Sequence, residues 1–159
     1  MREAEIKALL VDPSNNAPVI LLKDRNSSKA MPIWIGEAEA MSIALGLQSG
    51  SFPRPLSHDL MKAIIDDLEG SVEKIVISGL KEGTYYATIF LKSPDGSIAE
   101  VDARPSDSLA LALRVGSPIY VADEVFEASA IESPFAEEDA FQEFVECGMS
   151  LSQFKKLIG

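Results

Sequence analysis

The chain has 159 residues and a mass of 17.1 kDa, a length typical of one domain with its own hydrophobic core. With 47% hydrophobic and 25% charged residues, the composition excludes disordered, collagen-like and coiled-coil proteins. The sequence contains no apolar run of about 18 residues, so we expect no membrane span. The charged N-terminus lacks a signal-peptide pattern, and we expect a cytoplasmic protein. A single cysteine, Cys147, excludes an internal disulfide and a cysteine-cluster metal site.

The net charge of −11 argues against a protein that coats nucleic acids through their phosphates. Much of this acidity is local, because residues 121–159 carry 9 Asp/Glu and only 2 Lys/Arg. The remainder of the chain is mildly acidic and is compatible with a local basic patch.

Apolar runs separated by turn residues predict three strands, over residues 6–11, 19–23 and 30–35. An alanine- and leucine-rich segment then predicts a helix over residues 37–48, with Gly50 as a stop signal.

Residues 57–69 carry the clearest helical pattern of the sequence. Ser57 is the expected N-cap, and Gly70 is placed for a left-handed C-terminal cap. One apolar stripe runs along this helix and consists of Leu60, Met61, Ile64, Ile65 and Leu68.

The second half of the chain predicts strands over residues 72–78, 85–91 and 98–102, then a helix over residues 106–115. A last short strand is expected over residues 119–122.

The order strand, strand, strand, helix therefore occurs twice, at residues 6–48 and 72–115, with an offset of 68 between the copies. We interpret the fold as α+β, built from duplicated β-β-β-α units with a linking helix and a C-terminal helical tail. The expected division is a main domain at residues 1–130 and an acidic helical extension at residues 131–159.

Both repeat helices are unusually apolar. They are either buried within one α+β core or placed between copies of the chain. The second interpretation predicts a homo-oligomer, most simply a twofold dimer, with Phe135 and Phe141 as additional interface residues.

Residues 54–59 place an arginine, a histidine and an aspartate around one helix N-terminus, where backbone N–H groups favour anions. Arg54 could clamp a phosphate, and His58 could exchange protons near neutral pH. The structural alternative is that Ser57 caps the helix, Asp59 complements its dipole and His58 packs beside the stripe.

Residues 102–107 again join a strand end to a helix start. Asp102 and Asp107 could hold a divalent cation, and Arg104 could contact a phosphate. The alternative is a proline-initiated helix that uses Ser106 or Asp107 as its cap.

Residues 34–39 form the repeat-mate of that segment. Glu37 and Glu39 could converge at a strand-to-helix corner, although they would diverge on a regular helix. Trp34 could stack on a base, but a single tryptophan in an apolar strand is more often a core residue.

Several motifs, taken in order, resemble the bifunctional nuclease domain family. They include MPIWIGEAE at residues 31–39, FPRPLSHDL at 52–60, YYAT at 85–88, DARPSDS at 102–108 and PIYV at 118–121. The resemblance covers about residues 3–125 and implies an α+β fold and a nuclease activity on DNA and RNA.

The leading hypothesis is a nuclease that cleaves phosphodiester bonds, assisted by Mg²⁺ or Mn²⁺. The alternative is a non-enzymatic oligomeric module that binds a small anionic ligand or a partner protein. For the nuclease, the expected catalytic residues are His58, Asp59 and Asp107, the substrate contacts are Arg54, Arg104 and Ser106, and the metal ligands are Glu37, Glu39 and Asp102.

Overall fold

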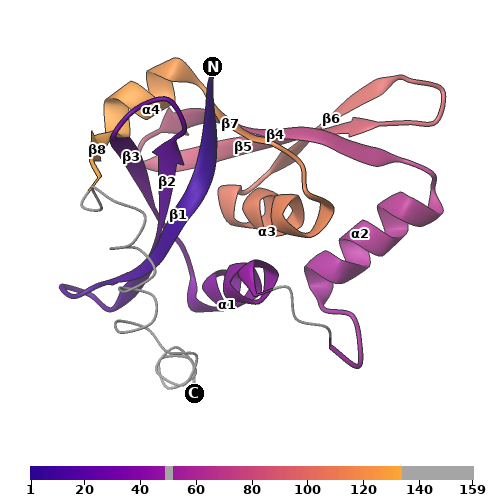
Figure 1. The fold of residues 1–159 in the computed structure, drawn as a ribbon, viewed down its shortest axis with the longest axis horizontal. Coiled ribbons are helices and arrows are strands. Elements are labelled where there is room, and N and C mark those ends of the chain that lie inside the picture. The colour runs from indigo at the N-terminus through magenta and orange to yellow at the C-terminus, as the bar shows by residue number, and fades with distance from the viewer. Residues whose placement is uncertain (49–51, 134–159) are drawn as a thin grey trace.

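One mixed β-sheet of eight strands organises the protein (Figure 1), in a computed structural model that describes residues 1–48 and 52–133. The order across the sheet is β6-β5-β4-β7-β1-β2-β3-β8. Neighbouring strands are antiparallel, except that β4 and β7 run parallel. The strands are β1 (Arg2–Asp12), β2 (Ala17–Asp24), β3 (Lys29–Trp34), β4 (Ser71–Lys81), β5 (Thr84–Lys92), β6 (Ile98–Ala103), β7 (Ile119–Val121) and β8 (Ile131–Glu132).

Strand β7 joins the two halves of the sheet. Its residue Ile119 lies opposite Ala4 of β1 on one side and Ile75 of β4 on the other. Each half consists of three consecutive antiparallel strands followed by a helix, and the α+β prediction is confirmed. The equivalence of the two halves as a duplicated unit stays a prediction.

Helix α3 (Pro105–Val115) lies next to the sheet, with α1 (Glu37–Leu47) and α2 (Ser57–Asp67) packed against it (Figure 1). Its residues from Leu109 to Ala112 are all buried, which explains why the sequence leaves this helix almost no polar face. Burial of α3 inside one chain is therefore sufficient to explain its apolar character, and no second copy of the chain is needed to cover it.

Glycine allows the close approach of α1 to α3. A Cβ atom at Gly46 would lie 3.1 Å from Nη1 of Arg114 and 3.2 Å from Cβ of Leu113. These distances are shorter than ordinary van der Waals contact, so a side chain at this position would push the two helices apart.

The ends of α2 differ from those expected from the sequence. Ser57 is the first helical residue rather than the N-cap, and the carboxylate of Asp59 accepts the N–H of the actual N-cap, Leu56, at 2.9 Å. At the other end the left-handed residue is Glu69, with φ of 57°, and not Gly70.

The apolar stripe of α2 is largely exposed. Leu60, Ile64 and Leu68 are 51%, 50% and 71% exposed, whereas Ile65 packs against the core. Periodicity predicts helix α2 correctly, but the other described residues cover little of the apolar face of this helix.

Trp34 is also exposed, at 52%, so the core interpretation of this residue is wrong. Its indole Nε1 donates to Oδ2 of Asp12 at 3.0 Å, which fixes the ring beside the β1–β2 turn.

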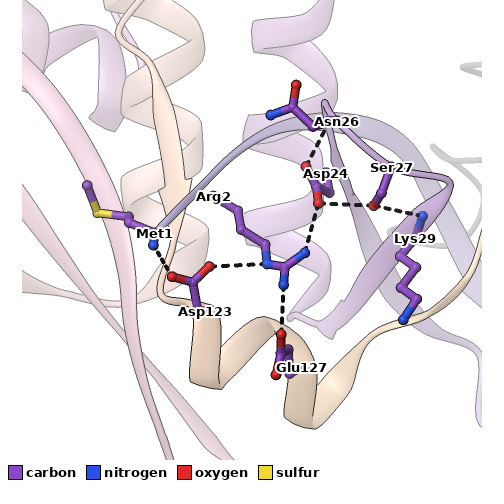
Figure 2. A network of polar contacts seen from close by, with 8 residues as sticks. All are labelled: Met1, Arg2, Asp24, Asn26, Ser27, Lys29, Asp123 and Glu127. Carbon is purple, nitrogen blue, oxygen red and sulfur yellow. Dashed lines mark hydrogen bonds and ion pairs between the residues drawn. The ribbon is translucent and has the colours of Figure 1, made fainter.

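Arg2 at the start of β1 connects this strand to two other parts of the fold (Figure 2). Its guanidinium contacts Asp24 at 3.1 Å, Asp123 at 3.2 Å and Glu127 at 2.8 Å, and it lies over the ring of Phe126. These contacts attach β1 to β2 and to α4 (Asp123–Ser129), which buries Phe126 in the core.

Helix α4 and strand β8 were not expected from the sequence. β8 pairs with β3, so residues 131–132 belong to the sheet. The helix expected over residues 137–159 and the interface candidates Phe135 and Phe141 lie outside the described residues. No helix in the described part of the chain is long and apolar enough to span a membrane.

Candidate functional site

Three helices meet at the imidazole of His58. Its Nδ1 lies 2.6 Å from Oγ of Ser42 on α1, and its Nε2 lies 3.0 Å from Oδ1 of Asp107 on α3. The His58 residue is only 7% exposed, so these two partners, rather than bulk water, occupy both ring nitrogens.

Local sequence places His58 and Asp107 in the first turns of their helices. His58 is the second residue of α2, which begins at Ser57, and Asp107 is the third residue of α3, which begins at Pro105. Pro105 favours the start of α3 because its missing N–H has no helical partner there. The carboxylate of Asp107 is stabilised by the positive end of the helix dipole.

Arg104 extends the chain of contacts to α1. Its Nε donates to Oδ2 of Asp107 at 3.2 Å, and its Nη2 lies 3.1 Å from Oε1 of Glu39. The hydrogen bond and charge of Asp107, with the charge of Glu39, raise the pKa of Arg104 above its ordinary value. The guanidinium is nevertheless 68% exposed, so it can meet an anion from solvent.

These groups line a surface pocket of about 340 Å³. Its polar lining residues are Glu39, Ser42, Ser57, His58, Arg104 and Asp107, and its apolar lining residues are Ala38, Met41, Leu45, Leu56 and Met61. Arg104 is the cationic group of the pocket and is paired with two carboxylates, so a phosphate would have to compete with them for its guanidinium.

A second network lies behind the pocket and fixes the three helices. The guanidinium of Arg114 is 8% exposed and donates to Oδ1 of Asp59 at 2.8 Å. It also donates to the backbone carbonyls of Ala110 at 2.9 Å and Ser42 at 3.1 Å. The N–H of Leu56 and, after it, Arg114 hold the pKa of Asp59 below its ordinary value. Arg114 therefore ties α3 to α1 and to the first turn of α2.

The bifunctional nuclease domain model matches residues 20–134 of this chain, a segment that contains every residue of the two networks. The chain belongs to the bifunctional nuclease domain family. The resemblance stated from the sequence motifs is thereby confirmed.

The chain is similar to bacterial and plant proteins. The chain is 43% identical over 134 residues to an uncharacterized protein of Mycobacterium tuberculosis, covering 84% of this chain and 79% of that protein. It is 24% identical over 115 residues to bifunctional nuclease 1 of Arabidopsis thaliana, covering 70% of this chain but 35% of the plant protein. It is 23% identical over 114 residues to bifunctional nuclease 1 of Oryza sativa subsp. indica, covering 70% of this chain and 34% of that protein.

Within this bifunctional nuclease domain, the pocket brings together Glu39, His58, Arg104 and Asp107 from the residues expected at the sequence level. Asp59 lines an adjacent pocket, where it is paired with Arg114.

The other expected residues are placed differently. Arg54 and Glu37 are exposed and do not line the His58 pocket. Asp102 is exposed on β6 opposite Thr88, whereas Ser106 is 7% exposed within α3.

Two residues of the site, Ser42 and Arg114, escaped the sequence analysis. Both lie away from the N-termini of α1 and α3, within segments whose apolar composition predicts burial but no binding or catalytic role. One available signal was that Arg114 is the only basic residue of α3 and follows the apolar run from Leu109 to Leu113.

The donor set offers little for Mg²⁺ or Mn²⁺. Among residues 1–48 and 52–133 no group of three or more His, Cys, Asp or Glu side chains is placed to hold a metal ion. Of the three expected ligands, Glu39 is engaged by Arg104, and Glu37 and Asp102 do not line its pocket. The described side chains therefore do not fit a protein-held divalent cation, since Mg²⁺ requires several oxygen ligands.

Proposed function

We propose that this protein is a nuclease that hydrolyses phosphodiester bonds of DNA or RNA in the His58 pocket. The observation that carries the proposal is the continuous chain of contacts from Ser42 through His58 and Asp107 to Arg104. Family membership and the names of the plant relatives support a nuclease in particular.

Phosphodiester hydrolysis needs stabilisation of negative charge on the phosphate and a group that moves a proton. Arg104 supplies the first, because its guanidinium is exposed at the pocket and presents paired N–H donors to phosphate oxygens. His58 supplies the second, and its path to the reacting atoms leads through Ser42, since Asp107 occupies the other nitrogen.

Asp107 holds the imidazole in one orientation and faces Arg104 with its second oxygen. Placement of a phosphate beside Arg104 would compete with the carboxylate of Glu39 for the guanidinium. Because the guanidinium is 68% exposed, water already weakens this ion pair, although the Glu39 side chain itself is only 22% exposed.

Cleavage of end-labelled single-stranded and duplex DNA and RNA tests the proposal. Wild-type protein is expected to cut at least one substrate, and His58→Asn, purified identically, is expected to cut it at least roughly 100-fold more slowly. Equal cleavage by both preparations would place the activity outside the His58 pocket, and failure of both, beside an active control nuclease, would reject the function.

Assistance by Mg²⁺ or Mn²⁺ remains a proposal. The same cleavage assay, repeated in the presence of EDTA, tests it. Because Arg104 can neutralise the phosphate, cleavage that persists in EDTA would agree with the described donor set. Complete loss of cleavage in EDTA would show that the reaction needs a divalent cation whose ligands include groups other than the described side chains.

The alternative function is an oligomeric binding module, and one observation favours its assembly. The exposed stripe of α2, formed by Leu60, Met61, Ile64 and Leu68, is a row of apolar side chains typical of an interface. We propose that a second copy of the chain covers this stripe in a homodimer. The assembly is compatible with either function, whereas ligand binding without cleavage would favour the module. A cytoplasmic location remains a further proposal from the sequence.

A further inference from the structure

We propose that Ser42 is the nucleophile of the site and that the reaction passes through a covalent intermediate in which Oγ of Ser42 is esterified to the phosphate of the cleaved strand. The inference rests on the proposed phosphodiesterase function and assigns a role to a side chain that the sequence motifs did not single out. Its basis is the order nucleophile, base, orienting acid, realised by Ser42, His58 and Asp107.

The direction of the hydrogen bonds follows from the chemistry of the groups. The Nε–H of Arg104 donates to Oδ2 of Asp107, which is an ionised carboxylate and can only accept. Nε2 of His58 must therefore donate to Oδ1 of Asp107. In a neutral imidazole the other nitrogen is then an acceptor, and Nδ1 accepts the hydroxyl proton of Ser42 at 2.6 Å. This is the arrangement in which His58 can remove that proton as Oγ attacks.

Two serines line the pocket, Ser42 and Ser57, and Ser42 is the one whose hydroxyl lies within hydrogen-bond distance of the imidazole of His58. Burial argues against two further serines nearby. The hydroxyl of Ser108 is buried and donates to the carbonyl of Arg104, and Ser106 is also buried. Ser42 lines the pocket, and its own carbonyl is held by the buried Arg114. Its position is therefore fixed from the backbone side while its hydroxyl faces His58.

The chemical step balances with water as the only co-reactant. Oγ of Ser42 attacks phosphorus, the Oγ–P bond forms, the bond from phosphorus to the leaving oxygen breaks, and the serine proton moves to Nδ1 of His58. The imidazolium then protonates the leaving oxygen, which departs as a hydroxyl group. In the second half-reaction, water attacks phosphorus of this serine phosphodiester and gives a proton to Nδ1. The Oγ–P bond breaks as that proton returns to Oγ, and the phosphate leaves as a monoester of the retained nucleoside.

Labelling with diisopropyl fluorophosphate tests the nucleophile independently of any nucleic acid. Attack by Oγ forms a stable Oγ–P bond and expels fluoride, and the proton passes through Nδ1 to solvent. Intact-mass measurement is expected to show one added diisopropylphosphoryl group, and peptide mapping is expected to place it on Ser42.

Three variants sharpen the labelling experiment. Ser42→Ala is expected to remain unlabelled, and His58→Asn is expected to label on the order of 100-fold more slowly. Ser78→Ala is the matched control, because Ser78 is exposed on β4 with its hydroxyl beside Thr88, and it is expected to label like wild type. Circular dichroism establishes that each variant is folded.

Absence of labelling in the wild type, or undiminished labelling of Ser42→Ala, would overturn the proposal. Cleavage assays separate this outcome from failure of the proposed function. If wild type and Ser42→Ala cut nucleic acid equally fast while His58→Asn does not, the nuclease stands and the Ser42 nucleophile falls. If Ser42 is labelled but no nucleic acid is cut, the nucleophile stands and the nuclease falls.

Discussion

The carboxylate of Glu39 on α1 meets the guanidinium of Arg104 at the start of α3, with Nη2 and Oε1 3.1 Å apart. This contact joins the two strand-to-helix corners that the repeat pattern relates, one after β3 and the other after β6. It also holds Arg104 at the pocket while leaving most of the guanidinium exposed.

Arg104→Ala is expected to lower kcat/KM for nucleic-acid cleavage by roughly 100-fold, the usual cost of removing a charge-stabilising donor. Arg104→Lys should recover little, because one ammonium cannot reproduce the paired N–H donors. The matched control is Arg25→Ala, because Arg25 is an exposed arginine that pairs with Glu3 and Glu5 at 3.5 and 3.9 Å. Activity of Arg104→Ala within twofold of the wild type would exclude Arg104 from the phosphate contact.

Arg114→Met is expected to lower the free energy of unfolding by roughly 1–3 kcal/mol, because it removes a buried guanidinium and leaves Asp59, whose side chain is 37% exposed, without its cation. It also removes the side-chain donor to the carbonyls of Ala110 and Ser42. Urea denaturation measures the loss, with Arg25→Met as the exposed control. Equal stability of the two variants would show that Arg114 does not fasten the helices together.

The pH dependence of stability should report on Asp24. Burial alone would raise its pKa, but hydrogen bonds from the N–H of Asn26, the hydroxyl of Ser27 and the guanidinium of Arg2 together lower it (Figure 2). Folding therefore favours the ionised form, and this stability is present above the unfolded pKa of 3.8 and lost as pH falls through the lower folded value.

Asp24→Asn should accordingly be less stable than wild type near neutral pH, with a difference that shrinks as the solution is acidified below about pH 4. Urea denaturation at a series of pH values measures this difference. Asp66→Asn is the control, since its exposed pair with Lys62 contributes little. A difference for Asp24→Asn that is independent of pH would contradict the assignment.

Much of the fold could be predicted from sequence because turn residues separate apolar runs of strand and helix length. Helix α4 was missed because it is short, with acidic residues among its apolar ones. The stripe on α2 shows a different limit. Periodicity reveals that one side of a helix is apolar, but not whether the same chain covers it.

The candidate site was predictable where a residue lies beside a helix N-terminus, as His58, Arg104 and Asp107 do. Ser42 and Arg114 acquire their roles only when α1, α2 and α3 pack together. Such a role depends on packing between helices, which no local sequence pattern encodes.

Light scattering at micromolar concentration tests the proposed homodimer. We expect twice the chain mass of 17.1 kDa, because the α2 stripe is exposed in the single chain. Leu60→Glu combined with Ile64→Glu should give the monomer mass, and Asp67→Ala, on the same helix, should not. A wild-type mass of 17.1 kDa that persists at higher concentration would reject the dimer.

Comparison of kcat/KM for nucleic-acid cleavage between wild type and His58→Asn tests the site most directly, because His58 is the group through which Ser42 and Asp107 are connected. The account predicts a loss of roughly 100- to 10,000-fold in a variant that remains folded, the range typical of a removed general base. A folded His58→Asn variant that cleaves nucleic acid as fast as wild type would place the activity elsewhere and contradict the account.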